Sequence, residues 1–157
     1  MDETDTAIVA GEEARLRAGA RYEAVRFEGL SLHGATLRDA RFLDCVFIDC
    51  DLSMARLDAV TLRGVRFEAC RLAGVDMGAL RDDGLGIEAT FDACDLDRVQ
   101  IAHADLRACV FTGGRARGAS LRRCDLRSVA FDGVDLTHAT FFGCDLREAD
   151  LRSARGY

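Results

Sequence analysis

The residues of this chain that could support metal or redox chemistry are its seven Cys and three His. Zinc sites in small domains are built from close pairs of ligands such as C-x2-C. The nearest pair here, Cys45 and Cys50, is five residues apart. Free Cys more often serves as a small buried hydrophobic residue, and buried free thiols favour a reducing compartment. We therefore expect no metal, no cofactor and a cytoplasmic location.

The acidic residues could instead supply paired carboxylates for general acid and base catalysis. Several directly precede a regularly spaced Leu, among them Asp51, Asp95, Asp105, Asp125, Asp135 and Asp145. Their recurrence favours a structural role, because a short carboxylate accepts hydrogen bonds from backbone N–H groups near a turn. The three His, at positions 33, 103 and 138, form no ligand cluster or nucleophile–base pair with one another. No Gly-rich phosphate loop is present, and we expect that the protein is not an enzyme.

All of these residues are positioned by a five-residue repeat. Large apolar residues occupy every fifth position from Phe27 to Met77 and again from Phe91 to Leu151, interrupted only at Ala116. A smaller apolar residue lies two positions before nearly every one of them, and every Cys occupies this slot. Residues two apart face the same side of an extended segment, and the other residues turn a corner, often with Gly. Four such units would close a square coil of about twenty residues, and successive coils would stack roughly 4.8 Å apart.

The aromatic residues indicate where this register changes. Phe27, Phe47 and Phe67 form one predicted column, whereas Phe91 follows Phe67 by four residues more than one coil. This difference predicts a four-residue loop insertion near residues 80–86. Its tip is predicted to contain Asp82 and Asp83.

The chain is thus predicted to have two parts. Residues 1–19 form an N-terminal segment in which residues 12–17 are expected to make a short capping helix that ends at Gly19. Residues 20–155 are expected to form a β-helix of about six to seven coils. The helix would cover the first coil, because solenoids require polar ends for solubility.

The repeat units themselves resemble a known family. Cys-Asp-Leu-Arg-Ser at 124–128, Ala-Asp-Leu-Arg-Ala at 104–108 and Ala-Asp-Leu-Arg-Ser at 149–153 resemble the A(D/N)LXX signature of pentapeptide-repeat proteins. The resemblance covers about residues 20–155. It implies an all-β fold, a right-handed quadrilateral parallel β-helix (pentapeptide-repeat solenoid).

The same resemblance implies a non-enzymatic protein-interaction module. The best-known branch of the family contains the Qnr-type and mycobacterial fluoroquinolone-resistance proteins. These imitate DNA, bind DNA gyrase or topoisomerase IV, and protect the enzyme from inhibitors. The resemblance therefore suggests that this chain is a DNA mimic whose partner is a type II topoisomerase.

The distribution of charge identifies the residues that would bind such a partner. The net charge of −6 argues against nucleic acid as a direct ligand, and the chain has no apolar run of membrane length. Regularly spaced carboxylates on one side of a rod could occupy a basic DNA-binding surface. The predicted partner-binding residues are Glu28, Asp49, Glu68, Asp92 and Asp132 on one side and Asp82 and Asp83 on the loop.

Two alternatives use other surfaces. A general interaction scaffold with an unidentified protein partner would use the outward apolar residues, which are Leu43, Val46, Ile48 and Phe142. A nucleic-acid binder would use a predicted basic cluster of Arg115, Arg117, Arg122 and Arg123, but this cluster lacks interleaved aromatic residues. No predicted cap follows Leu151. We therefore expect a homodimer through the C-terminal coils, with contacts from Phe142, Leu146 and Leu151.

Overall fold

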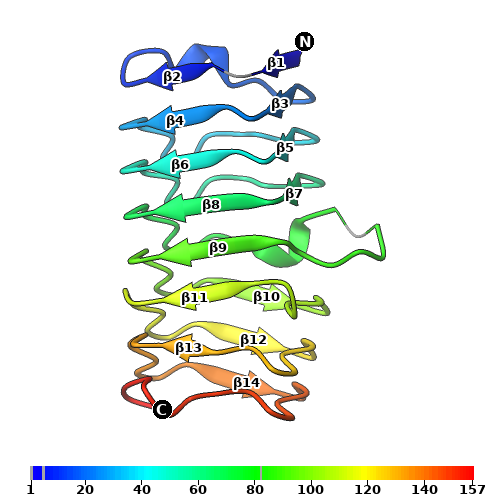
Figure 1. Cartoon of the computed structure of the whole chain (residues 1–157), viewed down its shortest axis with the longest axis vertical. Coiled ribbons are helices and arrows are strands. Elements are labelled where there is room, and N and C mark those ends of the chain that lie inside the picture. The colour runs from blue at the N-terminus through cyan, green and yellow to red at the C-terminus, as the bar shows by residue number, and fades with distance from the viewer. Residues whose placement is uncertain (1, 5, 82) are drawn as a thin grey trace.

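The protein winds into a four-sided rod with one corner at the end of each five-residue unit. The computed structural model describes residues 2–4, 6–81 and 83–157. Successive coils stack along the rod from the N-terminus to the C-terminus, in a right-handed sense (Figure 1). We number the sides 1 to 4 in chain order, with inward centres at Tyr22, Phe27, Leu32 and Leu37 in the first complete coil. The expected right-handed quadrilateral parallel β-helix is confirmed.

Side 2 carries a sheet that runs along the rod through all but the last coil. Its strands are β2 (Ala7–Val9), β4 (Arg26–Glu28), β6 (Val46–Ile48), β8 (Val65–Glu68), β9 (Ala89–Asp92), β11 (Val110–Thr112) and β13 (Phe131–Asp132). Neighbouring strands are parallel, and their inward Phe residues lie in register. The Phe rings stack in one column with centroid separations of 4.4 to 5.3 Å. This column lines the core along side 2.

The second stranded side changes along the rod. In the N-terminal half it is side 1, with β1 (Asp2–Thr4), β3 (Arg21–Glu23), β5 (Arg41–Leu43) and β7 (Thr61–Arg63). In the C-terminal half it is side 4, with β10 (Gln100–Ala102), β12 (Ser120–Arg122) and β14 (Thr140–Phe142). The other sides pair through isolated bridges such as Asp51↔Arg71. Aromatic centres lie on the stranded sides, which agrees with their preference for pleated backbone, whereas the bridged sides mostly have Leu centres.

The N-terminal segment covers the first coil mainly by strand pairing. Ile8 of β2 is fully buried and lies in register with Phe27. In place of the expected helix over residues 12–17 there is a single 3-10 turn, η1 (Glu13–Arg15). The Tyr22 hydroxyl accepts a hydrogen bond from the Arg17 N–H at 2.7 Å and donates one to the Arg15 carbonyl at 2.9 Å. These bonds satisfy backbone groups that a longer helix would have paired internally.

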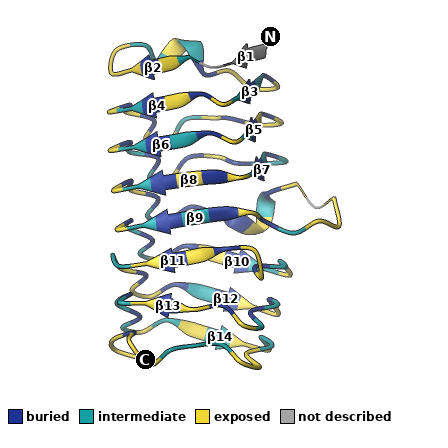
Figure 2. Ribbon diagram, viewed as in Figure 1, coloured by how far each residue is buried: buried dark blue, intermediate teal, exposed yellow. Residues whose placement is uncertain are grey.

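The inserted residues lie on side 1, between β7 and the next coil. The register pairs Phe67 with Phe91, so β8 and β9 are adjacent although the loop separates them in sequence. A second 3-10 turn, η2 (Met77–Ala79), precedes the loop, which projects from the rod (Figure 1). Buried residues line the interior along most of the rod, whereas the last coil is more exposed (Figure 2).

Candidate functional site

The predicted acidic residues lie together on side 2, as the repeat requires. The second outward position of the sheet is occupied by Glu28, Ile48, Glu68, Asp92, Thr112 and Asp132 in successive strands. We call its carboxylates (Glu28, Glu68, Asp92 and Asp132) the acidic column. Asp49 lies beside it at an exposed corner, with a φ of 52°. The structure therefore brings together all five carboxylates predicted for this side.

Two arginines that the sequence reasoning missed pair with this column. Arg26 forms an ion pair with Glu28 in the same strand. Arg66 pairs with Glu68 in its own strand, and its Nη2 lies 3.0 Å from the Asp92 Oδ2 in the next coil. Each arginine precedes its glutamate by two residues, so the two side chains share one face of a strand. That spacing is the signal from which the pairing could have been predicted.

The C-terminal end of the column has a neutral partner. The Ser153 hydroxyl donates a hydrogen bond of 2.7 Å to the Asp132 Oδ1 and accepts one of 3.2 Å from the Gly133 N–H. Within the described part of the chain, Asp132 is therefore the only member of the acidic column that forms no ion pair with an arginine. The charge of exposed Asp132 is therefore not compensated by a cation, so it contributes negative field at the C-terminal end of side 2.

The inserted loop is tied to side 1 of the rod through Asp83. Asp83 accepts hydrogen bonds from the Leu85 N–H at 2.9 Å and from Arg63 Nη2 at 3.1 Å. The backbone bond from Leu85, followed by the charge of Arg63, holds the pKa of Asp83 below its ordinary value. Asp83 therefore lies on side 1, away from the acidic column. Asp82, predicted beside it, lies outside the described residues.

The predicted basic cluster is divided by ion pairing. Arg115 Nη2 lies 2.8 Å from Asp95 Oδ2, and Arg117 Nη2 lies 2.7 Å from Asp97 Oδ2. These two arginines lie on side 3, and carboxylates of the preceding coil neutralise their charge. Arg122 and Arg123 lie on side 4 and at its corner. The four arginines therefore do not form one cationic patch.

Several of the regularly spaced Asp residues form ladders with arginines, whereas Asp51 and Asp135 accept hydrogen bonds from Ser53 and Thr137. Asp125 accepts two hydrogen bonds from Arg127, at 2.9 Å from Nε and 2.7 Å from Nη2, and lies 3.2 Å from Arg107 Nε. Asp145 and Arg147 repeat this arrangement one coil later. The hydrogen bond from Arg127 lowers the pKa of Asp125 to about 2. The backbone N–H and carbonyl groups of Asp125 also form hydrogen bonds with the preceding coil. The ion pairs of its side chain therefore reinforce the backbone bonds between coils.

The cysteines pack into the small inward slots. The Cys70 thiol donates to the Phe47 carbonyl at 3.2 Å, and the Cys94 thiol donates to the Phe67 carbonyl at 3.3 Å. Burial raises the pKa of Cys94 to about 11 and that of Cys109 to about 12. These thiols are therefore held in their protonated, weakly nucleophilic form. Within residues 2–4, 6–81 and 83–157, no group of three or more His, Cys, Asp or Glu side chains is placed to hold a metal ion.

The predicted dimer residues occupy two different surfaces. Phe142 points outward from β14 on side 4 and is 69% exposed. Leu146 and Leu151 occupy inward slots of the last coil, where Leu146 is 36% exposed and Leu151 is partly buried. Equivalent slots in the preceding coil, such as Leu126 and Phe131, are buried. The last coil therefore exposes part of its apolar interior.

None of the helices in the described segments has the length and apolar character needed to cross a membrane.

Known proteins are similar to this chain in repeat pattern and in fold. Two trypsin-treated variants of QnrB1, a plasmid-mediated fluoroquinolone resistance protein, superimpose with TM-scores of 0.57 and 0.55 at 22% and 18% identity; each match covers 98% of this chain and 78% of that chain. HetL, a pentapeptide repeat protein involved in heterocyst differentiation regulation from the cyanobacterium Nostoc sp., has a TM-score of 0.40 at 16% identity over 100% of this chain and 89% of its own. No curated protein sequence matches this chain. The model of the pentapeptide repeat region matches residues 20–80 and 87–155, and the chain belongs to the pentapeptide-repeat family.

Proposed function

We propose that this protein is an interaction module that binds a type II topoisomerase, DNA gyrase or topoisomerase IV, as a DNA mimic. In this proposal side 2 occupies the basic surface on which the enzyme holds DNA. Binding would displace or exclude the inhibitor-sensitive DNA complex and so protect the enzyme from quinolone-type or natural-product inhibitors. The fold that the chain shares with the fluoroquinolone resistance protein QnrB1 supports this choice of partner.

The acidic column is the observation that carries the proposal. Its carboxylates project from parallel strands of one sheet, in which neighbouring strands are about 4.8 Å apart. Glu68 and Asp92 lie on neighbouring strands, whereas the other carboxylates are separated by two strand spacings because Ile48 and Thr112 interrupt the column. A row of negative charge on a rigid support complements a basic groove and increases the rate of encounter with it. Arg26 and Arg66 neutralise part of the column, including Asp92, so its remaining field is expected to be strongest near Asp132.

A general interaction scaffold with another protein partner is the second candidate. Val46 and Ile48 interrupt the charges of side 2, and Val110 on the same side is 51% exposed. Burial of such residues would contribute affinity that salt does not screen. A partner that binds through the acidic column would instead be released as the ionic strength rises.

DNA supercoiling by purified gyrase, with and without a quinolone, tests the first candidate. We expect the full chain to inhibit supercoiling at high concentration and to restore activity in the presence of the drug. The double variant E68K/D92K should lose both effects. The double variant D58K/E148K, which makes the same change in charge away from side 2, is the matched control and should retain them. The absence of inhibition and protection at micromolar concentration would exclude the topoisomerase as partner.

Homodimerisation through the C-terminal coils is also proposed, in the cytoplasm, where free thiols remain reduced. The exposed interior of the last coil, at Leu146 and Leu151, would be covered by the partner copy. Sedimentation equilibrium should give the mass of a dimer at micromolar concentration, and Leu146→Asp should shift it toward the monomer. A monomeric mass for the unmodified chain would contradict this proposal.

A further inference from the structure

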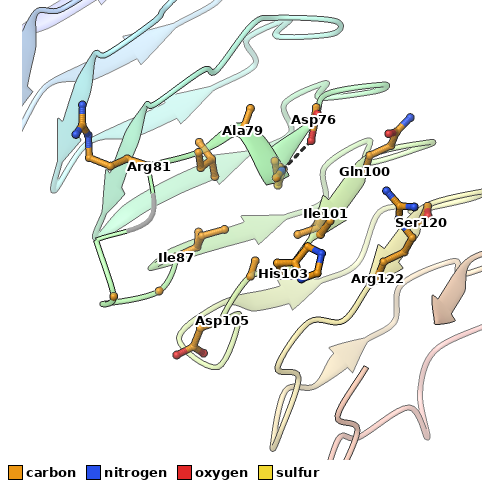
Figure 3. A pocket seen from close by; sticks show the side chains of 17 residues that line it. Asp76, Ala79, Arg81, Ile87, Gln100, Ile101, His103, Asp105, Ser120 and Arg122 are labelled. Atoms are coloured by element: carbon orange, nitrogen blue, oxygen red, sulfur yellow. Dashed lines mark hydrogen bonds between the residues drawn. The ribbon is translucent and has the colours of Figure 1, made fainter. Parts of the chain in front are cut away.

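A groove of about 570 Å³ lies between the base of the inserted loop and side 4. η2 forms one wall of it, and β10 with the corner that follows forms the opposite wall (Figure 3). Buried side chains of Met77, Leu80, Ile87 and Ile101 contribute its apolar surface. Grooves of roughly 300–1,000 Å³ with an apolar lining and a few polar groups are typical of sites for small organic ligands.

Two of the three basic side chains that line this groove lack partners among the described residues. His103 follows β10 and Arg122 ends β12, one coil further along, where Arg122 pairs in register with Ala102. Neither the imidazole nor the guanidinium makes a hydrogen bond or ion pair with the described residues. Arg81, the other cation of the lining, is directed to Asp39 at 3.3 Å. The wall formed by β10 and β12 therefore has two basic groups available to a ligand.

The carboxylates of the lining are already occupied. Asp76 accepts a hydrogen bond from the Gly78 N–H at 2.8 Å, as the dashed line in Figure 3 shows. Asp105 is held by Arg107 Nη2 at 2.8 Å. Neither carboxylate forms an ion pair with His103 or Arg122. They do make the groove unfavourable for ligands with several negative charges, such as phosphate esters.

We propose that this groove binds a small organic acid that carries one carboxylate on an apolar body. The carboxylate pairs with Arg122 and His103, and the apolar body covers Met77, Ile87 and Ile101. A guanidinium favours a carboxylate through paired, charge-assisted hydrogen bonds. The groove lies on side 4, opposite the acidic column of side 2, so this inference does not depend on the proposed topoisomerase partner.

Titration of the 15N-labelled full chain with benzoate, 2-naphthoate and decanoate, followed by amide chemical shifts, tests the site. We expect saturable shifts at Ile87, Ala102 and His103 with at least one of these acids. The corresponding neutral amide should bind about tenfold more weakly, because it lacks the charge that pairs with Arg122. The proposal is overturned if none of the three acids perturbs the groove, or if acid and amide bind equally.

Three variants and one control test which residues of the groove bind the carboxylate. Arg122→Gln and His103→Asn should each weaken binding by about tenfold; Asn tolerates the φ of 56° at position 103. Ala102→Phe should abolish binding by filling the groove without a change of charge. Arg123→Asn removes the same charge from the adjacent corner, which does not line the groove, and should leave the affinity unchanged. Equal losses in Arg122→Gln and Arg123→Asn, or no loss in Arg122→Gln, would show that the groove is not the binding site.

Discussion

Arg66 Nη2 lies 3.0 Å from the Asp92 Oδ2, and this ion pair joins the two coils that the inserted loop separates in sequence. β8 and β9 carry these residues and remain in register beneath the pair. The loop is therefore accommodated entirely on side 1, without a break in side 2. The continuity of the acidic column across the insertion depends on this register.

Replacement of Arg66 by Gln should strengthen binding to a basic partner. The substitution leaves Glu68 and Asp92 without their cation, which increases the negative field of side 2. The loss of stability should be below about 1 kcal/mol, because Arg66 is an exposed residue and surface ion pairs contribute little. Measurement of the gyrase affinity at low and high salt checks this, and weaker binding by Arg66→Gln would contradict a role for the column.

Truncation of Phe91 should have a large effect on stability. Its ring stacks between Phe67 at 5.2 Å and Phe111 at 5.3 Å, and the residue is 2% exposed. Phe91→Ala is expected to lower the free energy of unfolding by about 3–5 kcal/mol in urea titrations. Val110→Ala, in the adjacent strand but exposed, should change it by less than about 0.5 kcal/mol. Similar losses in both variants would show that the stack does not dominate the core.

Glycine is required at position 114, directly after a corner, for reasons of space as well as conformation. A Cβ on Gly114 would lie 2.2 Å from the Cys94 carbonyl oxygen, whereas one on Gly34 would meet no atom within 4 Å; their φ values are 69° and 65°. Gly34→Ala should therefore lower the free energy of unfolding by about 1 kcal/mol, because Ala disfavours the left-handed conformation. Gly114→Ala should cost about 3 kcal/mol, because it adds a steric clash. Equal changes in thermal unfolding would refute the steric part of this explanation.

Stability in acid should depend on the Asp ladders. Arg127 lowers the pKa of Asp125 to about 2 from 3.8. A carboxyl group whose pKa is lower in the folded state stabilises the fold above pH 3.8, and this contribution is lost as the pH falls toward 2. Asp125→Asn should therefore flatten the pH dependence of the unfolding free energy in this range. Parallel curves for variant and unmodified chain at low salt would contradict the prediction.

Ala116 is the one small residue in the series of large apolar slots, and a larger side chain there should stabilise the protein. Ala116 lines a small internal cavity of about 20 Å³, together with Leu96, Phe111 and Leu136. Ala116→Val should raise the free energy of unfolding by about 1 kcal/mol, as cavity-filling substitutions commonly do. Urea titration measures this change. A decrease would mean that the surrounding side chains cannot move enough to admit two more methyl groups.

The sequence was sufficient to predict the coil because the same chemical choice recurs in every unit. The slots of Leu, Phe and Cys have a five-residue spacing that neither a helix nor an ordinary strand produces. The interval from Phe67 to Phe91 is longer than one coil, and it therefore also predicted where the inserted residues lie. The N-terminal segment lacks this repetition, so its short polar stretch was assigned a helix from local preferences alone. Pairing of Ile8 with the Phe27 strand determines the observed structure instead.

The site was predicted less completely than the coil. The side to which each carboxylate belongs follows from its place in the unit, and Glu68 and Asp92 do lie side by side. The charge that a carboxylate presents depends on its neighbours in three dimensions, which include Arg66 here. The groove beside His103 arises from the path of the loop, and no five-residue pattern specifies that path.

The backbone bonds between coils have a mechanical consequence. Bonds such as Asp95 N–H to the Cys70 carbonyl and Arg115 N–H to the Cys94 carbonyl join one coil to the next along the rod. A pulling force applied at the two ends therefore acts in line with these bonds and loads the terminal coil first. The rod should yield by peeling one coil at a time at low force, whereas a bending load would be shared by the long sheet of side 2.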